Sequence, residues 1–119
     1  MIVGTGNVGA SIAFSLINQR TAVNEMVLVD INADDAEGEA MDLRDALAVA
    51  PSYLKIKSGT YKDAKGCDII VITAGANQKP GETRLDLLKK RQQGVLILRF
   101  ERFAAENGQS CDIIAVKLF

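Results

Sequence analysis

Hydrophobic and polar positions change along the chain in blocks that predict strands and helices in turn. Apolar runs with strand character occupy residues 1–3, 26–30 and 67–74, and residues 54–58 alternate apolar with polar, as in a short strand at a sheet edge. The run 67–74 is continuous and β-branched, which is typical of a strand covered on both faces. Residues 59–63 read as a turn.

Helical spacing fills the segments between these runs. The stretch 7–19 places Val8, Ile12 and Leu16 on one stripe suited to packing on a sheet. A second helix is expected over 33–49, ending before Pro51, with Asn32 or Asp34 as its cap. Strands that alternate with crossover segments predict an α/β fold with a parallel sheet and right-handed connections.

Glycines at the first strand-to-helix junction form a G-x-G-x-x-G motif, made by Gly4, Gly6 and Gly9. One makes a tight turn, one lets the backbone approach a pyrophosphate and one lets helix and strand pack closely, while Val8 between them could touch the cofactor. Asp30 ends the next strand, where a carboxylate can accept from ribose hydroxyls and repel a 2′-phosphate. A purely structural turn is the alternative, but this context favours NAD and a Rossmann-type doubly wound sheet.

Composition narrows the class of protein. The chain has 119 residues, 48% hydrophobic and 24% charged, which suits one globular domain. Its net charge of −1, without a basic stripe, argues against nucleic acid and anionic membranes as partners. No apolar run has the length of a membrane span and the chain opens directly on a strand, so we expect a cytoplasmic protein. Only three residues precede Gly4, so we expect a clipped first strand.

Cysteine and histidine usage limits the chemistry further. Cys67 and Cys111 are far apart in sequence and begin apolar runs, which favours buried reduced thiols over a disulfide or a metal site. No acidic cluster has metal-ligand spacing. Histidine is absent from the 119 residues, so this chain cannot complete a mechanism that needs an imidazole as proton donor.

The loop 75–84 combines Gly, Pro and polar side chains at the carboxyl end of the buried run, where it could act as a lid. Residues 73–87 resemble the active-site loop of NAD-dependent L-lactate dehydrogenases, in the lactate/malate dehydrogenase superfamily. Residues 3–9 and 38–43 are similar to that family's cofactor-domain patterns. The resemblance covers residues 1–90.

This resemblance implies roles for individual residues. Arg84 would be catalytic, closing over the substrate and polarising its ketone, as a guanidinium can. Gln78 would face the variable end of the substrate, where malate dehydrogenases carry arginine. Gly75 and Ala76 would lie against the cofactor, and Tyr61 near its adenosine half, with simple packing as the alternative for Tyr61.

The resemblance stops after Lys90. Residues 91–119 could form a helix to about residue 106, a turn at 107–108 and a strand over 111–118. The family would continue instead with an Asn-Pro loop and a substrate domain carrying an aspartate–histidine pair. We therefore expect an NAD-binding domain at 1–90 and a divergent tail at 91–119, with later strands and the substrate domain absent, as in a dehydrogenase cut short or put out of frame.

The resemblance implies an oxidoreductase that transfers a hydride between NADH and pyruvate, present as an N-terminal fragment and inactive alone. Its small-molecule partners would be pyruvate and lactate, and full-length relatives are usually homo-tetramers. The alternatives are a stand-alone dinucleotide sensor and a malate-type dehydrogenase. Intact Gln78 and Arg84 argue against the sensor, and Gln78 argues against the malate-type enzyme.

Overall fold

The computed structural model describes residues 1–75 and 92–116. Expectations for Ala76, Gln78 and Arg84 lie outside these described residues. The elements in chain order are β1 (Ile2–Val3), α1 (Asn7–Ile17), β2 (Glu25–Val29), α2 (Ala33–Ala46), β3 (Lys55–Ser58), the 3₁₀ helix η1 (Tyr61–Ala64), β4 (Ile69–Ile72), α4 (Gln92–Glu106) and β5 (Asp112–Ala115).

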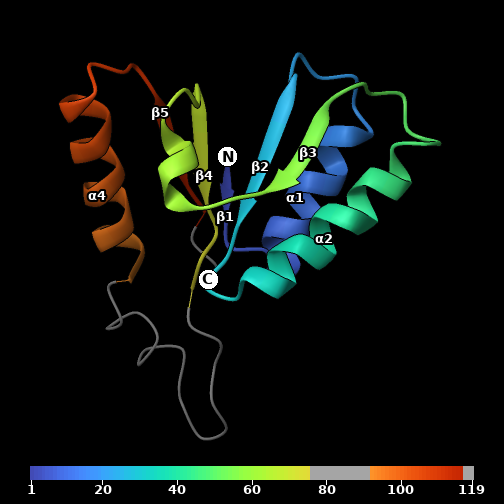
Figure 1. Ribbon diagram of the computed structural model, residues 1–119, viewed down its shortest axis with the longest axis horizontal. Helices are drawn as coiled ribbons and strands as arrows, with labels where there is room; N and C mark the ends of the chain where they lie inside the picture. Colours follow the sequence, from blue (N-terminus) through green and yellow to red (C-terminus); the bar gives the residue numbers. More distant parts are fainter. Residues whose placement is uncertain (76–91, 117–119) are drawn as a thin grey trace, which may run out of the picture.

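The strands form one parallel five-stranded sheet in the order β3-β2-β1-β4-β5 (Figure 1). The chain winds outward from β1 to β3, returns to the other side of β1 as β4, and continues outward to β5. This reversal beside β1 is the topological switch point of a doubly wound sheet, where ligands bind outside the carboxyl ends of the strands. The predicted Rossmann-type fold is confirmed, with β3 at an edge as expected.

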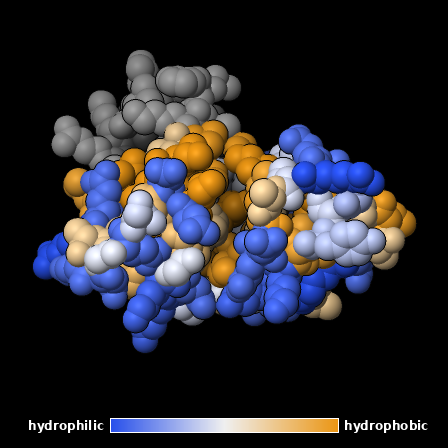
Figure 2. All heavy atoms as spheres, turned by 90° about the horizontal axis from the view of Figure 1, so that it is seen from above, coloured by the Kyte–Doolittle hydropathy of each residue, from blue (hydrophilic) through white to orange (hydrophobic). Residues whose placement is uncertain are grey.

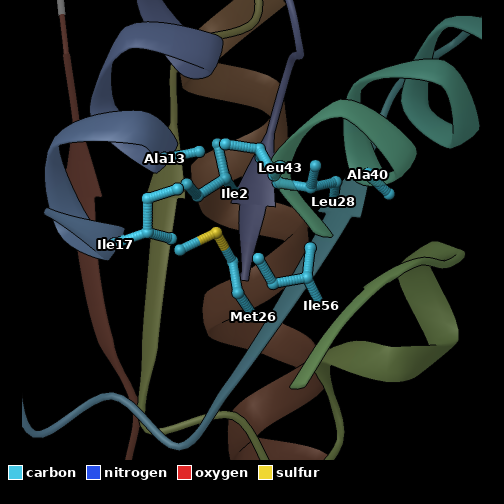
Figure 3. Packing of buried hydrophobic residues seen from close by; sticks show 8 residues of the cluster. All are labelled: Ile2, Ala13, Ile17, Met26, Leu28, Ala40, Leu43 and Ile56. Atoms are coloured by element: carbon cyan, nitrogen blue, oxygen red, sulfur yellow. The ribbon is translucent and has the colours of Figure 1, made fainter. Parts of the chain in front are cut away.

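Helices cover the two faces of the sheet separately. Helices α1 and α2 pack on one face over β1, β2 and β3, and α4 packs on the other face together with η1 (Figure 1). The core under α1 and α2 comprises Ile2, Ala13, Ile17, Met26, Leu28, Ala40, Leu43 and Ile56 (Figure 3). The second core, under α4, comprises Val3, Val27, Val29, Ala64, Ile70, Ile72 and Phe100. Seen from the amino ends of the strands, apolar residues gather in the middle between polar flanks (Figure 2).

Alternation along the strands explains the continuous apolar runs. In β2, Met26 and Leu28 belong to the first core while Val27 and Val29 belong to the second, so both faces of this strand are covered. Strand β4 is a correction to the expectation of full coverage, because Ile69 at its start remains 46% exposed. Helices α1 and α2 lie over the β1–β3 half of that face and leave the start of β4 open.

Side-chain caps mark the starts of α2 and η1. The Asn32 side chain accepts from the N–H of Asp34 at 3.2 Å and so caps α2, one of the two predicted caps. Helix α2 ends at Ala46, three residues before the expected position, and the chain continues in turns. The segment expected to be a plain turn contains the 3₁₀ helix η1, which the Thr60 and Asp63 capping box stabilises.

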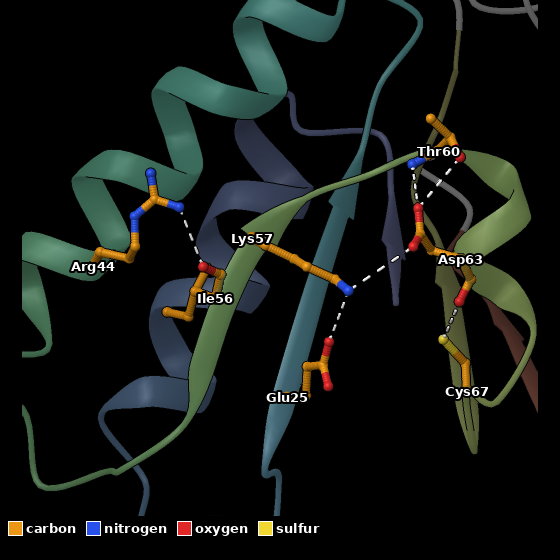
Figure 4. A network of polar contacts seen from close by, with 7 residues as sticks. All are labelled: Glu25, Arg44, Ile56, Lys57, Thr60, Asp63 and Cys67. Atoms are coloured by element: carbon orange, nitrogen blue, oxygen red, sulfur yellow. Dashed lines mark hydrogen bonds and ion pairs between the residues drawn. The ribbon is translucent and has the colours of Figure 1, made fainter.

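Polar contacts join α2 to the edge strand β3. Arg44 Nη1 donates to the carbonyl of Ile56 at 3.2 Å (Figure 4), and Arg44 Nη2 lies 2.8 Å from the Glu37 carboxylate. The Ser58 hydroxyl donates to the same carboxylate. These contacts lower the pKa of Glu37, first through Ser58 and then through Arg44. Within the described ranges, no helix is long and apolar enough to cross a membrane.

Candidate functional site

The turn between β1 and α1 is tightly enclosed by neighbouring strands. Gly4 has a φ of +98°, and its N–H donates to the carbonyl of Val29 at 2.8 Å. A Cβ on Gly4 would lie 2.6 Å from the backbone nitrogen of Ala74, and a Cβ on Gly9 would overlap the carbonyl oxygen of Gly4. Packing within the protein therefore requires glycine at both positions, the first and third of the motif.

Gly6 differs from the other two glycines because no described residue occupies the position where its side chain would lie. Within residues 1–75 and 92–116, a Cβ on Gly6 would meet no heavy atom within 4 Å, and its φ of −67° is open to any residue. Gly6 is the N-cap of α1, where no side chain caps the helix, and the first helical hydrogen bond runs from Ala10 N to Gly6 O at 2.9 Å. The N–H groups of residues 7–9 thus have no helical acceptor, and the open position beside them is the one at Gly6. This opening fits a phosphate group.

Asp30 follows β2 on the same edge of the sheet as the glycine turn. Its Oδ2 accepts from the backbone N–H of Thr5 at 2.7 Å and from the Thr5 hydroxyl at 3.1 Å, and its Oδ1 accepts from the N–H of Asn32 at 3.1 Å. Burial raises the pKa of Asp30, but the bonds from Thr5 and Asn32 outweigh it and hold the pKa below its ordinary value. The ionised carboxylate therefore fixes the turn and keeps an acceptor position on Oδ1.

Thr73 is a residue of the site that the sequence pattern did not reveal. It follows β4, is 8% exposed, and its hydroxyl donates to the carbonyl of Gly4 at 2.7 Å. The hydroxyl therefore satisfies a buried acceptor in the glycine turn. Thr5 was missed likewise, as the partner of Asp30. The sequence shows only that Thr73 is a hydroxyl residue near the end of an apolar run. Its role follows from its proximity to Gly4, which the sequence does not reveal.

Replacing Thr73 by valine should destabilise the protein by about 1–2 kcal/mol, because the shape is kept while the Gly4 carbonyl loses its donor. Urea unfolding of both variants measures this. Thr21→Val is a matched control, since the Thr21 hydroxyl makes only a 3.5 Å contact with the carbonyl of Leu16. An equal loss in the two variants would contradict the role given to Thr73.

The remaining predicted site residues lie in different surroundings. Gly75 is exposed just beyond β4, and no described residue lies within 4 Å of its would-be Cβ. Val8 is half-buried at the start of a shallow groove of about 310 Å³ along α1. The Tyr61 ring packs against Phe100 of α4, with ring centroids 5.9 Å apart, which fits the packing alternative given for this residue. In residues 1–75 and 92–116, no group of three or more His, Cys, Asp or Glu could hold a metal.

The chain was compared with known protein families and with individual proteins. Residues 1–116 match the family described as lactate/malate dehydrogenase, NAD binding domain. The chain is 59% identical over 90 residues to L-lactate dehydrogenase 2 of Bacillus cereus, covering 76% of this chain and 28% of that protein. It is 56% identical over 88 residues to L-lactate dehydrogenase of Lactococcus lactis subsp. cremoris, covering 74% of this chain and 28% of the relative.

Solved structures agree over a longer stretch. The minor L-lactate dehydrogenase of Enterococcus mundtii matches with a TM-score of 0.78 and 41% identity over 96% of this chain and 35% of its own. Malate dehydrogenase of Archaeoglobus fulgidus, solved in complex with NADH, matches with a TM-score of 0.78 and 42% identity over 98% of this chain and 39% of its own. The chain thus spans between a quarter and two fifths of the length of these relatives. It belongs to the lactate/malate dehydrogenase family and matches that family's NAD-binding domain.

Proposed function

We propose that this chain is the cofactor-binding part of an NAD-dependent L-lactate dehydrogenase, an oxidoreductase that transfers a hydride between NADH and pyruvate. The observation that carries this proposal is the open space at Gly6, at the uncapped start of α1 on the same sheet edge as Asp30. Residues 1–90 would form the part of the NAD-binding domain that carries the cofactor residues. Residues 91–119 would be a tail of divergent sequence that still supplies α4 and β5 of the same sheet, in keeping with the family match over residues 1–116.

The residues around this opening each have a binding role in the proposal. The N–H groups at the start of α1 hold the pyrophosphate, Gly6 allows its approach, and Gly4 and Gly9 give the turn the shape that binds it. Asp30 accepts from a ribose hydroxyl through Oδ1, while Oδ2 keeps the turn in place through Thr5. Val8, Gly75, Ala76 and Tyr61 line the cofactor in this proposal. When bound, NAD supplies the hydride chemistry.

Substrate contacts are assigned to the loop after β4. Arg84 donates to the substrate's ketone oxygen, on which negative charge develops, and thereby stabilises the transition state. Gln78 faces the opposite end of the substrate, where a neutral amide tolerates the methyl of pyruvate. A substrate with a carboxylate at that end, such as oxaloacetate, would instead need a cation, so Gln78 favours the lactate-type over the malate-type enzyme. The two curated relatives described above are both L-lactate dehydrogenases.

Reduction of pyruvate would require residues that this chain does not contain. Its 119 residues contain no histidine, so an imidazole that protonates the ketone oxygen would come from elsewhere, and this chain alone would not reduce pyruvate at an enzymatic rate. We place the protein in the cytoplasm and expect the complete enzyme to be a homo-tetramer. A stand-alone dinucleotide sensor is the second candidate, favoured by the absence of histidine and opposed by Gln78 and Arg84.

Asp30→Ser tests the cofactor assignment. The unmodified chain should bind NADH more tightly than NADPH, because the Asp30 carboxylate accepts from a ribose hydroxyl and repels a 2′-phosphate. The variant should lose about 1–3 kcal/mol of this preference. Fluorescence titration with both cofactors measures the change, and a thermal melt checks that loss of the Thr5 contacts has not unfolded the turn. Asp45→Ser, on exposed α2 surface, is the control. Equal affinity for both cofactors in the unmodified chain would remove Asp30 from this role.

A further inference from the structure

The two cysteines lie at the amino ends of neighbouring strands, at the edge of the sheet opposite the cofactor site. Strands β4 and β5 pair in parallel with Ile69 beside Asp112, and the N–H of Asp112 donates to the carbonyl of Asp68 at 2.8 Å. One step earlier in this register, Cys111 lies beside Asp68, the residue that follows Cys67. Strand spacing of about 4.8 Å and one residue of offset put the two cysteine Cα atoms about 6 Å apart, within the range that disulfides span.

Gln109 fixes this approach by joining the segments that lead into the two strands. Its Nε2 donates to the carbonyls of Ala64 at 3.1 Å and Cys67 at 2.7 Å, and its Oε1 accepts from the N–H of Gly66 at 3.0 Å. A single amide thus holds the turn before β4 against the turn before β5. The proximity of the cysteines therefore does not depend on the strand register alone.

Both thiols lie on the same face of the sheet. Cys67 and Cys111 are half-buried free cysteines that pack against the second core, the cluster under α4. The Cys67 thiol donates to the carbonyl of Asp63 at 3.1 Å, which directs it toward η1 on that face (Figure 4). The pKa of Cys111 is raised, first by burial and then by the negative charge that Cys67 would carry when ionised.

We propose that Cys67 and Cys111 form a dithiol that a low-molecular-weight disulfide oxidises to an intramolecular disulfide joining β4 to β5. A cysteine thiolate attacks one sulfur of oxidised glutathione, which forms a mixed disulfide and releases one glutathione thiol. The second thiolate attacks the protein sulfur of that mixed disulfide and releases the second glutathione thiol. The two cysteines lose two electrons and two protons in all, and glutathione disulfide is reduced to two thiols.

The sequence favoured buried reduced thiols because Cys67 and Cys111 are far apart along the chain. Both cysteines are free in the structure, as expected, but they are half-buried and lie at the starts of paired strands. The proposed bond would fasten the edge strand β5 to the sheet without reaching the glycine turn or Asp30. A disulfide that forms and is reduced in this way is the type found in proteins of reducing compartments, where such bonds are reversible.

The test is oxidation of the reduced, full 119-residue chain with oxidised glutathione, followed by thiol titration and intact mass measurement. We expect loss of both free thiols, a mass lower by about 2 Da with no glutathione attached, and independence of protein concentration. Trypsin digestion without reductant should yield peptide 66–84 joined to peptide 103–117. Dithiothreitol should separate these two peptides.

Two controls test whether the disulfide needs both cysteines and the folded structure. Cys67→Ser and Cys111→Ser should each leave one thiol, which takes up one glutathione and forms no internal bond. The same oxidation in guanidinium measures the pairing of the unfolded chain, and the equilibrium constant for the disulfide should be at least about a hundredfold larger in the native protein. Glutathione attached separately to both cysteines, disulfide-linked dimers, or equal constants in the folded and unfolded chain would overturn the proposal.

Discussion

Gly9→Ala is expected to destabilise the chain by roughly 3 kcal/mol or more and to abolish NADH binding, because the added Cβ would overlap the backbone carbonyl of Gly4. The obstacle is backbone on one side and the buried Thr73 hydroxyl, 2.9 Å away, on the other, so no flexible side chain can move aside. The turn between β1 and α1 would have to open. Urea unfolding followed by circular dichroism measures the loss.

Gly38→Ala is the matched control for this substitution. Gly38 lies inside α2, and apart from the backbone of that helix no described residue lies within 4 Å of its would-be Cβ. Alanine should therefore stabilise the helix by about 0.5–1 kcal/mol. Opposite signs for the two glycine-to-alanine changes would show that packing at the turn, and not loss of glycine as such, decides the result. A loss below about 1 kcal/mol for Gly9→Ala would contradict the packing argument.

Gly6→Ala separates the structural from the ligand-binding role of the motif. The fold should be unchanged, because the site of the added methyl group is open, while affinity for NADH should fall at least about tenfold, equal to about 1.4 kcal/mol, as the methyl group occupies the space for the pyrophosphate. Titration with NADH and a thermal melt of the same sample give both values. Unchanged affinity would favour the reading of the motif as a structural turn.

Gln78→Arg should exchange the substrate preference of an enzyme completed with the substrate domain of a close relative. Oxaloacetate presents a carboxylate where pyruvate has a methyl group, and an arginine can form a bidentate pair with that carboxylate. With pyruvate, the guanidinium would be buried without a partner. A charge pair made or broken in a closed site is worth roughly 2–5 kcal/mol, so the ratio of the two kcat/KM values should change by at least about a hundredfold.

Steady-state kinetics with both substrates measure this ratio. Gln78→Asn, which keeps a neutral amide, is the control and should leave the ratio within about tenfold of its starting value. If Gln78→Arg also changes the ratio by less than about tenfold, Gln78 does not face the substrate. The assignment to the lactate-type rather than the malate-type enzyme would then lose its main support.

The sequence by itself determined the sheet, the glycine turn and the acid at the end of β2, because each is encoded by spacing over a few neighbouring residues. Gly4, Gly6 and Gly9 lie within one turn and its helix start, and strand periodicity marks β2 without knowledge of its neighbours. The loop that carries Gln78 and Arg84 was identified by resemblance and lies outside the described residues, so its roles stay predictions.

Tertiary structure decided which of these local signals act together, because the contacts join residues far apart in the chain. Only the pairing of β1 with β4 brings the Thr73 hydroxyl to the carbonyl of Gly4, and only the position of α1 and α2 leaves Ile69 exposed. Thr5 and Asp30 are 25 residues apart, so no local pattern predicts that Thr5 donates to one carboxylate oxygen of Asp30. The starts of β4 and β5, where Cys67 and Cys111 lie, are neighbours for the same reason: parallel pairing aligns the amino ends of the two strands, which no local pattern in either segment encodes.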